Sequence, residues 1–265
     1  MCRGTRAEKS RWMMTTASDA DAHRAHTTVQ SWRTLFYVGG IAAILFVMLF
    51  LCALVLDFLA PPPENGGVET LEFISRNRAI YSAEQILWIL PDILPVLTFL
   101  ALFVALAPDN KALALICVTV AGVGWALLRV LPTSGRGSLV LVNLSDSYVE
   151  AGSASQRQVY STAAEVIIAE NNTPSLLGVL SAVGIALAST AMIRSALPRL
   201  VGWLGVVAGV VGVVSEVSAY TLPALSSAYG LLLWAWFVSV GIALIRLARR
   251  TPERGPGAAD GTAGG

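Results

Sequence analysis

The sequence predicts an all-α, polytopic integral membrane protein: a bundle of six transmembrane helices with short amphipathic helices on the outer side. Of its 265 residues, 55% are hydrophobic and only 13% are charged, which is too little polar surface for a water-soluble globule. Six apolar runs each approach or exceed the about 20 residues that a helix needs to cross a bilayer. Lysine and arginine collect on alternate sides of these runs, and this bias predicts the direction of each crossing.

The apolar runs divide the chain into a membrane domain, residues 34–250, and two tails, residues 1–33 and 251–265. The first tail has no sustained apolar period and the second is rich in Gly and Pro, so we expect both to be disordered and cytoplasmic. The predicted spans are residues 35–60, 86–107, 112–131, 174–193, 200–222 and 228–245.

Thirteen of the eighteen basic residues lie on the side where the chain starts, which predicts that both termini are cytoplasmic. The first apolar run is longer than the about 7 to 15 residues of a signal-peptide core, so it predicts an uncleaved span. Arginine far outnumbers lysine, and Ala, Gly and Val are abundant, as is typical of GC-rich bacterial genomes. We therefore expect the plasma membrane of a bacterium.

The two long outer connections predict short helices. Pro61, Pro62 and Pro63 should end the first span, and Leu71 and Ile74 then mark one face of a helix lying at the interface. The second connection contains two amphipathic pieces, around 139–142 and 159–167, which we expect to cap the outer end of the bundle. Eight acids in these connections, Glu84 among them, predict a hydrated surface rather than a cation-selective one.

The fourth and fifth spans carry the clearest packing signal. Four glycines of the fifth span recur at intervals of three and four, so they share one helix face that another backbone can approach closely. The short connection between the two spans predicts that they are antiparallel neighbours. The predicted contact joins Gly202, Gly205, Gly209 and Gly212 to a matching stripe of Ser181, Gly184 and Ala188.

Ionisable residues within membrane spans cost about 2.5 to 3.5 kcal/mol each at mid-membrane, so each requires a reason. Asp57, Asp92, Arg129 and Glu216 all fall in the outer half of their spans. Pro91 and Pro95 bracket Asp92, which predicts a kinked second span with free carbonyl groups near the carboxylate. Glu216 continues the glycine stripe and should point into the bundle.

Two interpretations of these charges remain open. The first is an outward-open polar cavity for a small cationic or zwitterionic solute, in which Trp88 and Trp125 accompany the charges at helical spacing. The second is an internal salt bridge in which Arg129 neutralises one of the acids without any ligand. The candidate ligand-binding residues are Asp92, Arg129, Glu216, Trp88 and Trp125.

Other chemistry finds little support in the sequence. His23 and His26 are the only histidines and both lie in the first tail, so we expect no metal site and no cofactor. Ser215 and Ser218 have no general base nearby except Glu216, which argues against an enzyme. Nucleic-acid binding lacks the basic and aromatic pattern that it requires. The expected partners are membrane lipid and a small-molecule ligand whose identity the sequence does not give.

Gly39 and Gly40 open the first span, and the segment 197–205 leads a short basic connection into a glycine-lined helix. In these features the chain resembles domain-of-unknown-function family 4386 over residues 31–250. The resemblance implies a bacterial six-span membrane protein with no assigned activity, and it transfers no functional residue. We expect a protein that binds or senses a small solute or lipid. A secondary transporter is the second hypothesis and an intramembrane enzyme the third.

Overall fold

The computed structural model describes residues 32–63, 65–127, 133–134, 137–171, 173, 176–218 and 222–250. It is helical apart from one short hairpin, and five of its helices are long and apolar enough to cross a membrane. A further apolar helix, Lys111–Leu127, has 17 residues. The fold is therefore that of a membrane-embedded helical protein. Arg129 and nearly all of both predicted tails lie outside the described residues.

Helix boundaries follow the predicted spans to within a few residues, except at the second and the last. The elements are α2 (Arg33–Leu59), α3 (Gly67–Ile89), η1 (Leu90–Ile93), α4 (Leu94–Leu106), α5 (Lys111–Leu127), β1 (Thr133–Ser134), β2 (Gly137–Ser138), α6 (Leu139–Glu150), α7 (Ala154–Asn171), α8 (Leu176–Ile193), α9 (Arg199–Val217) and α10 (Pro223–Arg250).

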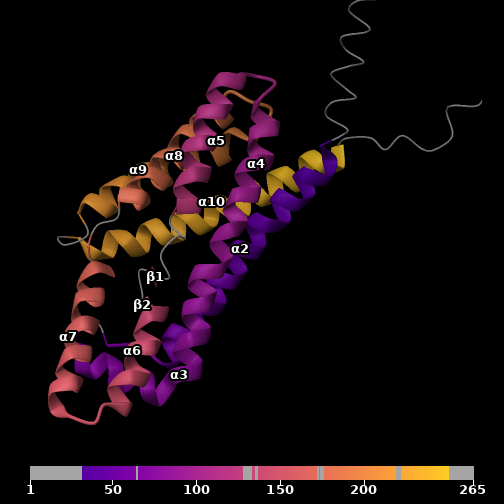
Figure 1. Cartoon of the computed structure of the whole chain (residues 1–265). Helices are drawn as coiled ribbons and strands as arrows, with labels where there is room; N and C mark the ends of the chain where they lie inside the picture. Colours follow the sequence, from indigo (N-terminus) through magenta and orange to yellow (C-terminus); the bar gives the residue numbers. More distant parts are fainter. Residues whose placement is uncertain are drawn as a thin grey trace, which may run out of the picture.

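The six apolar helices close into a ring. Neighbouring helices pack on one another in the order α2, α4, α5, α8, α9, α10. The ring closes because α10 also packs on α2. The start of α2 and the end of α10 lie side by side at one end of the bundle (Figure 1), and we call the opposite end the distal end. Ile41, Met48 and Val55 of α2 point outward at heptad spacing and are more than half exposed, as expected for a lipid-facing surface.

Aromatic rings fill the centre of the ring of helices. Phe46 of α2 contacts Phe237 of α10 at 4.6 Å and Trp125 of α5 at 5.4 Å between ring centroids. Phe99 of α4 lies 6.1 Å from Trp236. Edge-on and tilted pairs of this kind are favourable, and they join helices that are distant in the sequence.

The predicted break in the second span is confirmed. Leu90–Ile93 form a 3₁₀ turn that contains Pro91, and the Leu94 amide donates to the Pro91 carbonyl because Pro95 has no amide of its own. The prediction of a helix before this span is confirmed in part: a helical segment precedes the span, but a kink at Asn77 and not a loop joins the two. Residues 68–90 contain neither Gly nor Pro, so no loop separates the two segments, and α3 runs from Gly67 to the break with one kink at Asn77.

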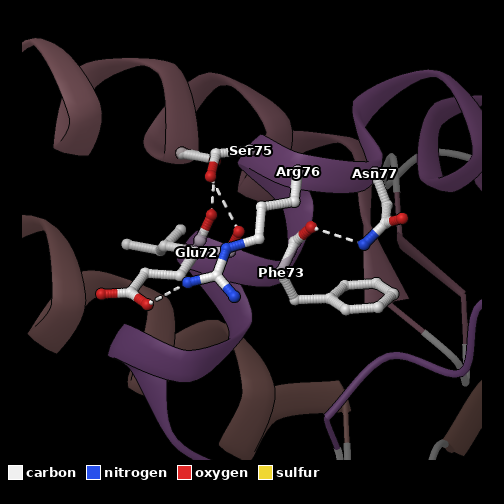
Figure 2. A network of polar contacts seen from close by, with 7 residues as sticks. Glu72, Phe73, Ser75, Arg76 and Asn77 are labelled. Atoms are coloured by element: carbon white, nitrogen blue, oxygen red, sulfur yellow. Dashed lines mark hydrogen bonds and ion pairs between the residues drawn. The ribbon is translucent and has the colours of Figure 1, made fainter.

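One irregularity divides α3 into two halves. Asn77 has φ −119° and ψ 26°, outside the helical range, and its Nδ2 atom donates to the Phe73 carbonyl at 3.1 Å (Figure 2). The preceding residue, Arg76, pairs at 3.0 Å with Glu72, which stands one turn earlier on the exposed side. When an asparagine side chain donates a hydrogen bond to a main-chain carbonyl of the preceding turn, it competes with the helical hydrogen bond there, and the helix bends at that point.

The first half of α3 forms a lobe with α6 and α7 at the distal end (Figure 1). This lobe has its own core, in which Leu71 and Ile74 of α3 pack with Leu141 of α6 and Ala164 of α7. The two predicted amphipathic pieces are thus confirmed as helices. They pack on the extension of α3 instead of on the ends of the spans.

Polar contacts fasten the lobe helices together. The Ser145 hydroxyl donates to the Leu71 carbonyl at 2.7 Å, and the Arg78 guanidinium meets the Asp146 carboxylate at 2.8 and 3.0 Å. The hydrogen bonds from Arg78, together with its positive charge, hold the pKa of Asp146 below its usual range. A carboxylate with a lowered pKa stabilises the fold above its ordinary pKa, and the effect is lost as the pH falls through the folded-state value.

The prediction that the fourth and fifth spans pack closely is confirmed, but the matching stripe is wrong. Gly209 of α9 faces α8. A Cβ at Gly209 would lie 2.7 Å from the Ala182 carbonyl oxygen and 2.7 Å from the Ala186 Cβ. Gly202 and Gly205 face Ser189, and Gly212 faces Ala182. The α8 residues nearest these glycines therefore differ by one or more positions from the residues of the predicted stripe.

Ser181 and Gly184 face α5 instead. A Cβ at Gly184 would lie 2.5 Å from the Ala121 Cα, and one at Gly124 would lie 3.0 Å from the Ser181 Oγ. Ala188 is fully buried in the central core. Small residues thus occupy two faces of α8, which lies between α5 and α9.

We predict that Gly184→Ala lowers the stability of the protein in detergent by about 1–3 kcal/mol, because a Cβ there would overlap the backbone of α5. Gly122→Ala is the matched control, since a Cβ at Gly122 meets nothing within 4 Å and alanine favours the helix. Thermal unfolding of both variants measures the difference. Equal stability of the two would contradict the close α5–α8 contact.

Candidate functional site

Three buried polar side chains, which we call the buried polar cluster, lie in the break of the second span and in the helix just before it. These are Glu84, Gln85 and Asp92, whose exposed fractions are 0%, 0% and 1%. Glu84 and Asp92 stand two helical turns apart, which is roughly 12 Å along the axis. Two carboxyl groups and an amide are thus buried within α3 and the 3₁₀ turn that follows it.

Trp88 stands one helical turn after Glu84 and one turn before Asp92 in the sequence. Its indole Nε1 donates to the Glu84 Oε1 at 3.1 Å, and its ring contacts Phe50 of α2 at 4.9 Å. The side chain therefore joins the buried polar cluster to the aromatic core. A hydrogen bond to a buried carboxylate is stronger than one between neutral groups.

The β1–β2 hairpin covers this part of α3. Its strands pair antiparallel, with Thr133 opposite Ser138 and Ser134 opposite Gly137. The Ser138 amide donates to the Tyr81 hydroxyl at 3.1 Å, and a Cβ at Gly137 would lie 2.9 Å from the Gln85 Nε2 and overlap the Tyr81 hydroxyl. Only glycine allows this approach. The Ser138 hydroxyl also caps α6 by accepting from the Val140 amide at 3.1 Å.

The predicted ligand-binding residues fall in different surroundings. Asp92 and Trp88 belong to the region just described, whereas Trp125 is 5% exposed and packs between Phe46 and Phe237. Trp125 therefore lies in the aromatic core, and the partly buried Trp88 packs against it. Their role in ligand binding stays a prediction.

Glu216 occupies a separate position near the distal ends of α8, α9 and α10. Its carboxylate rests against Gly178, where a Cβ would overlap the Glu216 Oε1, and it lies close enough to Tyr229 to interact electrostatically. By contrast, η1 with Asp92 packs on α2, α3, α4 and α5. Asp57 is 8% exposed near the end of α2. Arg129, the predicted partner of the acids, lies outside the described residues.

Glu84 and Gln85 were not predicted as site residues. The sequence groups Glu84 with the hydrated acids of the first outer connection, and this interpretation is wrong because α3 continues through that position into the bundle. A signal was present in the sequence. Tyr81 and Gln85 stand four residues apart, as do Glu84 and Trp88, so each pair shares a helix face.

The serines considered as nucleophiles are engaged elsewhere. The Ser215 hydroxyl donates to the Ser226 hydroxyl at 3.0 Å, and the Ser218 hydroxyl donates to the Val214 carbonyl at 2.6 Å. Within the described part of the chain, no group of three or more His, Cys, Asp or Glu side chains could hold a metal ion.

The fold and the buried polar cluster define a polytopic helical membrane protein. No family model, no curated protein and no solved structure matches the chain. The resemblance to domain-of-unknown-function family 4386 therefore stays a prediction.

We predict that Trp88→Phe lowers stability by about 1.5–3 kcal/mol, because phenylalanine keeps the aromatic packing but leaves the Glu84 carboxylate without this donor. Trp203→Phe is the control, since Trp203 is 58% exposed on α9. Thermal unfolding in detergent compares the two. A loss no larger than that of the control would show that the bond to Glu84 does not contribute.

Proposed function

We propose that this protein spans the bacterial plasma membrane six times and binds or senses a small cationic or zwitterionic solute at the buried polar cluster. The observation that carries the proposal is the burial of Glu84 near the end of α3 and of Asp92 in the break that follows it. A carboxyl group inside a membrane is costly and marks a functional site by default. Carboxylates and freed carbonyl groups favour a positively charged ligand.

The proposed topology counts α5 as a membrane span in addition to the five long apolar helices. This span would cover the predicted range 112–131. Both ends of the chain would then be cytoplasmic, in agreement with the excess of basic residues there. The lobe and the hairpin would face the exterior. In this orientation, a solute would reach the buried polar cluster from outside, past the hairpin.

A secondary transporter is the second candidate, and the broken second span favours it. Transporters commonly use paired broken helices in two structural repeats. In the described part of the chain α9 is an unbroken helix from Arg199 to Val217, so it supplies no counterpart to η1. Binding or sensing therefore takes precedence over transport. An intramembrane enzyme is third, because Ser215 and Ser218 bond to groups that cannot act as a base.

A structural role for the buried polar cluster also has an observation in its favour. Glu84 accepts from Trp88, and the hairpin is held on Tyr81, so the same groups could fasten the hairpin and lobe to the bundle. This alternative, and the predicted pairing of an acid with Arg129, requires no ligand. Stability measurements with and without solutes distinguish these possibilities.

We predict that a panel of small cations, amines and zwitterions contains a compound that raises the melting temperature of the purified protein. The rise should saturate with concentration, because a ligand bound only by the folded state stabilises it. Glu84→Gln and Asp92→Asn should each abolish the rise. Glu72→Gln, on the exposed side of α3, should retain it.

The contrary result is equally specific. Marked destabilisation by Glu84→Gln and Asp92→Asn, together with no response of the wild type to any compound, would favour the structural role. Uptake of a stabilising compound into proteoliposomes would shift the assignment from sensing to transport.

A further inference from the structure

A second site candidate lies on the lobe, away from the buried polar cluster. A hollow of about 300 Å³ opens between the start of α3, the end of α6 and the first turns of α7. Its walls include Val68 of α3, Tyr148 of α6, and Ser153, Arg157, Gln158 and Ser161 at or within α7. This volume is at the lower end of the range for small-molecule sites.

Arg157 is the only charged side chain among the residues that line the hollow. Two other arginines of the lobe are neutralised, since Arg76 pairs with Glu72 at 3.0 Å and Arg78 pairs with Asp146 at 2.8 Å. Among the described residues, Arg157 has no such carboxylate partner. Its guanidinium is therefore available to a ligand.

Close packing holds the walls of the hollow in place. Gly67 of α3 lies directly against the Ser161 carbonyl of α7, where a Cβ would overlap that oxygen. The connection between α6 and α7 is fixed where the Gly152 amide donates to the Gln156 Oε1 at 3.1 Å. The phenol of Tyr148 lines the hollow opposite α7, and within the described residues no hydrogen bond engages its hydroxyl.

We propose that this hollow binds a small oxyanion, a carboxylate or phosphate group, through Arg157. A guanidinium presents paired N–H donors that match the two oxygens of such a group. The Tyr148 hydroxyl supplies a neutral hydrogen-bonding group on the other wall. The source of the oxyanion is either a free solute or the phosphate of a lipid headgroup, and the site is independent of the solute site proposed above.

The test uses the full chain in neutral detergent, with succinate and inorganic phosphate as soluble probes at constant ionic strength. A parallel series adds phosphatidylglycerol or phosphatidylcholine to the micelles. We expect a saturable rise in melting temperature with at least one oxyanion, abolished by Arg157→Gln and weakened by Tyr148→Phe. Arg76→Gln, an exposed arginine of the same lobe, is the matched control and should keep the full rise.

Stabilisation by succinate or phosphate identifies a free solute, and stabilisation by phosphatidylglycerol alone identifies a headgroup. The absence of a saturable rise with every probe, or a rise of equal size in Arg157→Gln, would overturn the proposal. Because Arg157 is exposed, the variant should unfold at the wild-type temperature without anion. The double variant Glu84→Gln, Asp92→Asn should keep the anion response, so failure of one site is distinguishable from failure of the other.

Discussion

Close contact between helix backbones is the constraint on which the rest of this structure depends. Lipid offers no hydrophobic drive for helices to associate, so they gain stability by van der Waals contact, which requires small residues. In α2, Gly39 lies against Ala101 and the Leu97 carbonyl of α4. The adjacent Gly40 lies against α10, where a Cβ at Gly40 would be 2.8 Å from the Gly241 carbonyl oxygen. Two adjacent glycines thus join the helix to both of its neighbours and close the ring. The Thr98 hydroxyl adds a hydrogen bond to the Gly39 carbonyl at 3.1 Å.

The same constraint explains which packing could be predicted from the sequence. The glycine stripe of α9 was evident because glycine is conspicuous at intervals of three and four, and its contact with α8 followed from the short connection. The face of α8 was harder to predict, because Ala182, Ala186 and Ser189 are as small as Ser181, Gly184 and Ala188. Two small-residue faces on one helix leave the choice of partner open, and only the position of α5 resolves it.

The buried acids illustrate a different limit of sequence reasoning. Asp92 was predicted to be special because prolines flank it within an apolar run, and the break at this position is confirmed. Glu84 lay outside the predicted span, and hydropathy alone gives no reason to bury it. Its burial depends on the length of α3, on the indole of Trp88 and on the hairpin held by Tyr81, which are tertiary features. The single helix α3 carries lobe core residues at one end and both of these polar groups, Glu84 and Gln85, at the other.

The most direct test of this packing is disulfide cross-linking on the two faces of α8, in a variant whose three native cysteines are replaced by alanine. Ser181 faces Gly124 of α5, and Ala182 faces Gly212 of α9 with 2.9 Å between its Cβ and the position of a glycine Cβ. The structure predicts that cysteine pairs at 124/181 and at 182/212 form disulfides on mild oxidation, because small shifts bring them to bonding distance. Cysteine pairs at 124/182 and 181/212 should remain reduced. Disulfides in these exchanged pairs, and none in the first two, would contradict the arrangement of α8 between α5 and α9.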